Sequence, residues 1–320
     1  MKIKHTFMEM FKTKDDVFYY EKAKRLLNDN DVAMQYQGLL CLKKTLELYP
    51  KYKKTGEAFM YAQLMFTDTS EESRKSIINL LTEALKHDPD CADYYYYRAK
   101  CLNNEFGELW KVPDRKSISG LPDISILDRV VSDITKAIDL RPKTLFDHQG
   151  VKMFFGMDLS NVMAELYQMR ANAHVYYYHR YKEDFSEKIP IYRQAIEDLT
   201  QAITHSIDSD MMGGDPRGQM YFMRAECHLE LVKKRKFSWE NNEFSESDKV
   251  NLQRALDDFL VAKDKLSSYF PNRCYENASI CYACLGMHQK AYDIFMDGID
   301  KGELKLDDFR LEGLKERIDK

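Results

Sequence analysis

An eight-residue segment that occurs three times places the strongest constraint on how this 320-residue chain can fold. The copies are YYYYRAKC at 94–101, LYQMRANA at 166–173 and MYFMRAEC at 220–227. Each copy is followed by a matched second segment: VVSDITKA at 130–137, AIEDLTQA at 195–202 and ALDDFLVA at 255–262. Two segments that recur as a pair are typical of helical repeat proteins, whose usual product is a binding surface rather than a catalytic pocket.

The spacing within these segments indicates helices. Ala195, Leu199 and Ala202 share one face of a helix, because they lie four and then three residues apart. In the first segments a tyrosine precedes a small residue by four positions, as Tyr95 precedes Ala99. Several units also close on a proline, as in AIDLRP at 137–142. This combination resembles the tetratricopeptide repeat, a helix–turn–helix unit of 34 residues. The resemblance covers nearly the whole chain, strongly in the last four units and loosely in the first two.

The resemblance implies an all-α fold, a TPR-type α-solenoid of about six helical hairpins with long intra-hairpin insertions and a C-terminal capping helix. We refer to the two helices of each hairpin as helix A and helix B. The hairpins are expected at 16–50, 55–89, 92–142, 161–207, 217–270 and 273–303, with the cap at 307–318. Helices A are expected near 16–29, 55–67, 92–104, 161–181, 217–233 and 273–285. Helices B are expected near 32–48, 73–87, 125–140, 189–205, 249–267 and 288–301. These helices would form one right-handed superhelix.

Four insertions interrupt the repeat. Residues 106–124 contain prolines and glycines and predict an ordered loop. The segment 142–161 separates the third hairpin from the fourth. The stretch VYYYHRYKEDFSEKI at 175–189 has a composition that favours lengthening of both flanking helices. The charged segment 233–249 is expected to be mobile. Its basic run 233–236 could be a phosphate or localisation patch, but a solvated helix end is favoured.

Composition narrows the class of protein. The formal net charge of −4 gives no excess of basic residues of the kind that binds nucleic acids. No apolar stretch approaches the length of a membrane span. The N-terminus lacks the apolar segment of a signal peptide, so export is not expected. Seven scattered cysteines then indicate a reducing compartment, and we expect a cytoplasmic location. Cys101, Cys227 and Cys281 share one register with Ala173, which predicts small buried side chains.

No catalytic or cofactor motif is present. The chain has no glycine-rich phosphate loop, no nucleophile elbow and no kinase-type set, so we expect neither an enzyme nor a bound cofactor. Cys281, Cys284 and His288 could suggest zinc or redox chemistry, but no second ligand pair has suitable spacing. Two classes of function remain. The favoured one is a scaffold or adaptor that binds a peptide or partner protein in a concave groove. The alternative is a ligand- or peptide-sensing regulatory protein whose insertions carry a catalytic or effector function.

Paired charges predict an internal contact. The third, fourth and fifth hairpins carry an arginine just before the core alanine of helix A and an aspartate just before the large apolar residue of helix B. The pairs are Arg98 with Asp133, Arg170 with Asp198, and Arg224 with Asp258. The other three hairpins lack both members. Because the arginine and the aspartate occur together or are absent together, we predict a partly buried ion pair between the two helices of a hairpin. The less favoured alternative is that both residues are separate surface charges at matching positions.

The resemblance also implies which residues line a groove, namely those three before, one after and four after the small core position of helix A. The candidate peptide-binding residues are Tyr20, Lys24, Phe59, Gln63, Tyr96, Lys100, Asn103, Gln168, Asn172, Phe222, Glu226 and Glu276. A chaperone-tail clamp would need more Lys, Asn and Arg than these places provide. Aromatic rings beside amides suit a peptide of mixed character. The alternative is that insertions cover the rings. If the rings are exposed, the double substitution Tyr96→Ala and Phe222→Ala should weaken partner binding and leave the melting temperature nearly unchanged.

Overall fold

The computed structural model is helical throughout the parts of the chain that it describes. These are residues 18–23, 25–26, 32–48, 71–87, 89–110, 123–141, 159–182, 184–206, 217–232, 244–265, 271–305 and 307–318. The chain divides into two compact units, Met1–Leu166 and Tyr167–Lys320. No helix in the described ranges is long and apolar enough to cross a membrane.

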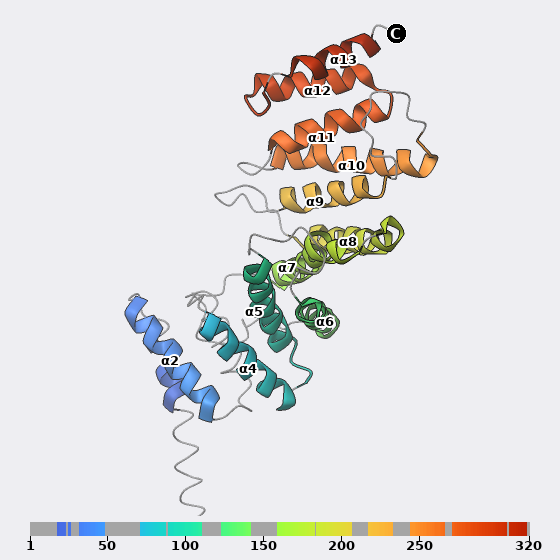
Figure 1. The fold of residues 1–320 in the computed structure, drawn as a ribbon. Coiled ribbons are helices and arrows are strands. Elements are labelled where there is room, and N and C mark those ends of the chain that lie inside the picture. Colours follow the sequence, from blue (N-terminus) through green and yellow to red (C-terminus); the bar gives the residue numbers. More distant parts are fainter. Residues whose placement is uncertain are drawn as a thin grey trace, which may run out of the picture. The chain divides into compact units, whose positions relative to one another are not determined.

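The first unit contains α2 (Val32–Leu48), α4 (Glu71–His87), α5 (Ala92–Trp110) and α6 (Ile124–Leu140), preceded by helical residues at 18–23 and 25–26. Helix α5 packs against both α4 and α6 (Figure 1). Helix α6 begins after Asp123, whose carboxylate accepts a hydrogen bond from the Ser125 backbone N–H at 3.0 Å. A carboxylate at this position satisfies one of the N–H groups that the first helical turn leaves unpaired.

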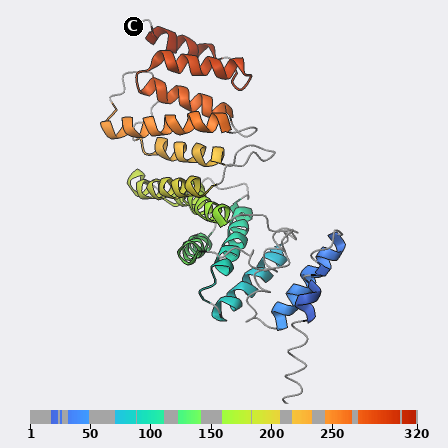
Figure 2. The ribbon, with the colours of Figure 1, turned by 180° about the vertical axis from the view of Figure 1, so that it is seen from behind.

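Helix α7 (Leu159–Asn172) runs through the division between the units and continues as a π-helical turn, Ala173–Tyr177, and a 3₁₀ turn, Tyr178–Tyr181. The second unit then contains α8 (Phe185–His205), α9 (Arg217–Glu230), α10 (Glu246–Lys265), α11 (Pro271–Cys284), α12 (His288–Asp300) and α13 (Asp308–Ile318). From α8 onward each helix packs on the next one along the chain, and Figures 1 and 2 show α9 to α13 stacked in that order.

The repeated small residues allow the helices of a pair to approach closely. Ala99, Ala171 and Ala225 of the helices A have no exposed surface, and neither do Ala195 and Ala255 of the helices B. Larger side chains fill the space around them, among them Phe259 and Leu199, which are also fully buried. Burial of such apolar area is the main stabilising contribution to a helical repeat.

Local signals set several helix ends. The Ser245 hydroxyl donates to Asp248 at 2.6 Å, and the Asp248 N–H donates back to Ser245 at 3.2 Å, which forms a capping box at the start of α10. Helix α11 ends in a Schellman turn, in which the Met287 N–H donates to the Tyr282 carbonyl at 2.9 Å. Gly286 takes a φ of +77° in this turn, a conformation that other residues rarely adopt.

The all-α class predicted from the repeat is confirmed, with antiparallel helix pairs packed in sequence. Most observed bounds lie within a few residues of the predicted ones; α2 matches its prediction, and α8 begins at Phe185 where 189 was expected. The prediction of a loop from residue 106 is wrong in its first part, because α5 continues as a helix to Trp110 where an end near 104 was expected. The insertion at 175–189 does lengthen its neighbours, through the π and 3₁₀ turns and the early start of α8. Residues 51–70, which include the second predicted helix A, lie outside the described residues, as do 111–122, 142–158 and 233–243 of the other insertions.

Candidate binding surface

The structure brings each predicted arginine against its predicted aspartate, with two parallel hydrogen bonds in every case. The Nε–Oδ2 distance is 2.7 Å for Arg98 and Asp133, 2.9 Å for Arg170 and Asp198, and 2.8 Å for Arg224 and Asp258. The aspartate side chains are at most 9% exposed. The bond to Asp133 raises the pKa of Arg98. Two-pronged pairs of this kind fix orientation as well as charge.

The same arginines make two contacts that the sequence reasoning missed. Each guanidinium lies over the tyrosine three residues earlier, at 5.7 Å from the ring centre for Arg98 over Tyr95 and 5.4 Å for Arg224 over Tyr221. Arg98 and Arg224 also donate to a threonine on the preceding helix B, at 3.2 Å for Thr82 and 3.0 Å for Thr200. The arginine therefore joins its own hairpin to the one before it.

A signal for the threonine was available in the sequence. A threonine lies two residues after the position at which the third to fifth hairpins carry their aspartate. It occurs in the hairpin that precedes each arginine: Thr82 before Arg98, Thr135 before Arg170 and Thr200 before Arg224. The corresponding place before the arginine-free last hairpin holds Leu260. This pattern is visible only when positions in neighbouring hairpins are compared, because its two members belong to different hairpins.

The structure corrects the predicted groove. Tyr96 is 2% exposed, Phe222 is 5% exposed and Tyr20 is also buried, so the prediction that these rings line an open groove is wrong. For Tyr96 and Phe222, a side chain of the next helix A lies against the ring. The Tyr96 hydroxyl donates to Glu165 of α7, and the Arg273 guanidinium lies 5.1 Å above the Phe222 ring.

The other candidates are partly exposed or outside the described part of the chain. Lys100, Asn103, Gln168, Asn172, Glu226 and Glu276 are half-buried, whereas Lys24, Phe59 and Gln63 lie outside the described residues. Lys100 forms an ion pair with Glu165 at 2.7 Å, and Glu226 pairs with Arg273. Glu165 and Arg273 share one register, six residues before the small position of their helices. In both cases a charge on one helix A is therefore matched by the next helix A.

A surface-exposed aromatic ring does occur in the second unit, at a position the prediction omitted. Tyr176 lies in the π-helical turn after α7 and is 44% exposed. Partial burial and then the negative charge of Glu226 raise the pKa of Tyr176. Departures from α-helical hydrogen bonding, such as this π-turn, are frequent at functional sites.

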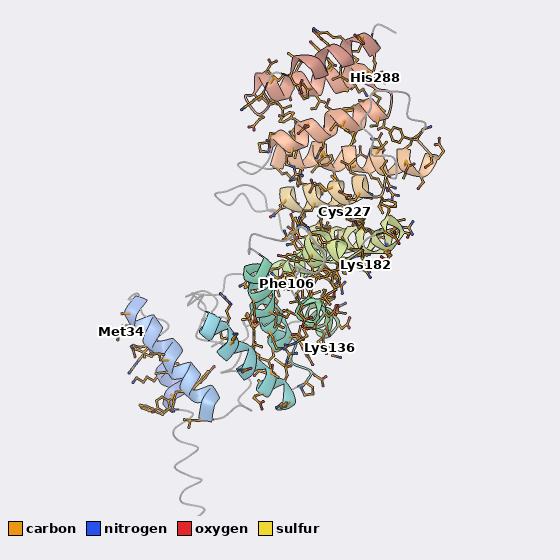
Figure 3. All side chains as sticks on the ribbon, in the orientation of Figure 1. Met34, Phe106, Lys136, Lys182, Cys227 and His288 are labelled. Carbon is orange, nitrogen blue, oxygen red and sulfur yellow. The ribbon has the colours of Figure 1, made fainter. Side chains whose placement is uncertain are left out.

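Asn172 provides a second feature of the same region. Its side-chain oxygen is buried and has no hydrogen-bond partner among the described residues. A buried acceptor without a donor is costly and rare, so it calls for an explanation. We call Gln168, Asn172, Tyr176, Glu226 and Arg273 the helix-A face of the second unit. Figure 3 labels the fully buried Cys227 on α9, the neighbour of Glu226.

The cysteine side chains are mostly buried in the core, and the histidines differ in their contacts. All seven cysteines are free, and burial raises the pKa of the Cys101 thiol to about 12, which disfavours the reactive thiolate. His228 contacts the Asn251 side chain at 3.2 Å, while the Nδ1 atom of His174 has no hydrogen-bond partner within the described ranges. No group of three or more His, Cys, Asp or Glu that could hold a metal occurs in the described part.

The solved structures that are similar to this chain include two tetratricopeptide-repeat proteins. The crystal structure of TTC0263, a thermophilic TPR protein of Thermus thermophilus, matches with a TM-score of 0.38 and 11% identity, over 88% of this chain and 99% of that one. The TPR2AB domain of yeast Sti1, in a complex with pHSP90, matches with a TM-score of 0.25 and 12% identity, over 95% and 98%. No family model and no curated protein matches the sequence. The chain is thus a helical repeat protein that is similar in its repeated residues to the tetratricopeptide repeat.

Proposed function

We propose that this protein is a non-catalytic interaction module that binds a peptide or partner segment on the helix-A face of the second unit. The observation that supports the proposal is the exposed ring of Tyr176, which lies four residues after Asn172, in the unit that also contains the Glu226–Arg273 ion pair. An aromatic anchor with adjacent polar groups is the usual composition of a strong peptide contact. Helical repeats of this kind typically act as protein-binding scaffolds.

A selection from a random peptide display library on the full chain tests this proposal. Enriched peptides should lose most of their affinity, about tenfold or more, when Tyr176 is replaced by alanine. The matched control is Phe185→Ala, because Phe185 is a comparably exposed ring, at 37%, at the start of a helix B. Peptides that bind both variants and the parent chain equally well would place the binding surface elsewhere.

We further propose that the protein works in a reducing compartment such as the cytoplasm. Six of the seven thiols are buried, and burial raises the pKa of Cys284, the partly exposed one, to about 11. Alkylation of freshly lysed cells followed by mass spectrometry should find all seven cysteines as free thiols. A disulfide between any two of them in the native protein would contradict this location.

A further inference from the structure

One cation of the helix-A face lies on the solvent side of the two groups that hold it. The Arg273 guanidinium of α11 lies 5.1 Å from the Phe222 ring centre and donates a hydrogen bond to the Glu226 carboxylate. Both partners belong to α9. Phe222 is 5% exposed and the Glu226 side chain 22%, whereas the Arg273 side chain is 48% exposed. Arg273 therefore covers a ring and a carboxylate that are more deeply buried than it is.

Phe222 and Glu226 together form a site for a cationic side chain, which we call the α9 cation site. They lie four residues apart on one helix, so they share a face. An aromatic ring attracts a cation through its quadrupole, and a carboxylate adds a charge-assisted hydrogen bond. A planar guanidinium can use both groups at once. The site therefore suits any arginine, whether it belongs to this chain or to a partner.

Two properties of Arg273 make it replaceable. It is the third residue of α11, which begins at Pro271, and the first turn of this helix contains no acidic residue. The helix macrodipole disfavours a positive charge at this end. In addition, the Arg273 side chain is half exposed, and exposed ion pairs contribute little because the ordering of a long side chain offsets the attraction. A basic side chain from outside can therefore compete with Arg273.

The first unit holds similar groups in a more interlocked arrangement. Lys100 lies 5.2 Å from the Tyr96 ring centre on the same helix, and it pairs with Glu165 of the next helix A at 2.7 Å. The Tyr96 hydroxyl also donates to Glu165. Each of these three groups contacts the other two, so withdrawal of the lysine leaves the ring and the carboxylate joined to each other. The α9 cation site differs, since one side chain from another helix covers it.

We infer that Arg273 is an autoinhibitory contact, which occupies the α9 cation site in the free chain and is displaced by an arginine or lysine of the partner segment. This inference rests on the proposed function, because it names the regulation of the same helix-A face. The apparent affinity for a basic segment is then the intrinsic affinity reduced by the fraction of molecules whose site is open. Removing Arg273 should raise the affinity, whereas removing a residue that binds the partner directly should lower it.

Fluorescence anisotropy on the full chain tests this direction. The probe is a labelled seven-residue Gly/Ser peptide that carries two arginines. Arg273→Ala should bind it about fivefold more tightly than the parent chain, a factor that matches the largest contribution of an exposed ion pair. Adding Glu226→Gln to Arg273→Ala should remove the gain, because the site then lacks its carboxylate. A peptide with two citrullines, which keep the size of arginine without its charge, should show no gain.

Lys290→Ala is the matched control for the loss of one positive charge beside a ring. Lys290 is exposed and lies 5.9 Å from the Tyr282 ring centre, also in the last hairpin. This variant should bind the arginine peptide as the parent chain does. Melting temperatures of all variants show whether they are folded. Binding of the arginine peptide by Arg273→Ala that is no tighter than by the parent chain, or an equal gain in Lys290→Ala, would overturn the inference.

A small cation tests the site without any peptide. Methylguanidinium at about 20 mM should raise the melting temperature of Arg273→Ala relative to the parent chain, because a ligand that fills the vacated site stabilises the folded state. Methylurea, which is neutral and of similar shape, should not do so. Equal shifts by methylguanidinium in Arg273→Ala, in the parent chain and in Arg273→Ala with Glu226→Gln would also overturn the inference.

The two proposals fail in different ways. If Arg273→Ala gains no affinity while the selected peptides still depend on Tyr176, the autoinhibitory contact is wrong and the proposed function stands. If Arg273→Ala gains affinity for the arginine peptide while the selected peptides do not depend on Tyr176, the autoinhibitory contact stands and the proposed anchor is wrong.

Discussion

At the scale of single residues, the arginine that joins neighbouring hairpins is the most consequential side chain. Replacing Arg224 with methionine should lower the free energy of unfolding by about 3–5 kcal/mol, because Asp258 would remain buried without its partner. Removing both charges, as Arg224→Met with Asp258→Leu, should restore much of that loss. Urea denaturation of the parent, the two single variants and the double variant measures the coupling.

An exposed ion pair offers the matched control. Lys249 and Glu246 also lie 2.7 Å apart, but their side chains are 50% and 87% exposed. Lys249→Met should therefore change the free energy of unfolding by less than about 0.5 kcal/mol. Equal losses for Arg224→Met and Lys249→Met would mean that the buried pair has no special role.

Three buried or half-buried histidines should make the folded protein less stable in mild acid. Burial lowers the pKa values of His174, His228 and His288 in the folded chain, so the unfolded chain binds more protons as the pH falls through the ordinary histidine pKa of about 6.5. The free energy of unfolding should therefore be higher at about pH 7.5 than at about pH 5.5. His228→Gln should reduce this pH dependence, and a variant with the same pH dependence as the parent would contradict the argument for His228.

At the scale of helices and turns, the close approach of α12 to its neighbours depends on one glycine. A Cβ atom added at Gly298 would lie 2.9 Å from Leu304 Cδ1 and 3.0 Å from Tyr275 Cγ. Gly298→Ala should lower the free energy of unfolding by about 1–3 kcal/mol, because contacts this short force the neighbours to move. At Gly313 of α13 a Cβ would meet nothing within 4 Å, so Gly313→Ala should stabilise by up to about 1 kcal/mol. Thermal unfolding of both variants distinguishes the two effects.

The contact between consecutive hairpins can be tested at the threonine. The Thr200 hydroxyl donates to the Ile196 carbonyl at 2.8 Å and accepts from Arg224, whereas the exposed Thr204 makes the same backbone contact at 2.8 Å without an arginine. Thr200→Val should lower the free energy of unfolding by about 1–2 kcal/mol, and Thr204→Val should have a smaller effect. Similar values for the two variants in chemical denaturation would show that the arginine contact does not stabilise the stack.

At the scale of the whole molecule, the helix pairs could be predicted from the sequence because their signal is local. Small and large apolar residues recur at helical spacing within each segment, so Ala195, Leu199 and Ala202 indicate a buried face without reference to any other hairpin. The ion pairs could be predicted for a related reason, since both partners belong to one repeated unit.

The composition of the binding surface could not be predicted in this way. Whether Tyr96 or Phe222 is exposed depends on the residue that the next helix A presents, here Glu165 and Arg273, and the repeat pattern does not fix that position. Tyr176 was missed because it lies in a π-turn within an insertion, where the register of the repeat no longer applies. Because both rings belong to the core, Tyr96→Ala with Phe222→Ala should lower the melting temperature strongly.

Hydrogen exchange with and without a selected peptide tests the central claim most directly. Binding on the helix-A face should slow exchange of backbone amides in the π-turn after α7, in α9 and in the first turns of α11, and should leave the middle of α8 and α10 unchanged. Tyr176→Ala should remove this protection at the same peptide concentration. Protection confined to the helices B, or protection of α9 and α11 that persists in Tyr176→Ala, would contradict a binding site on this face.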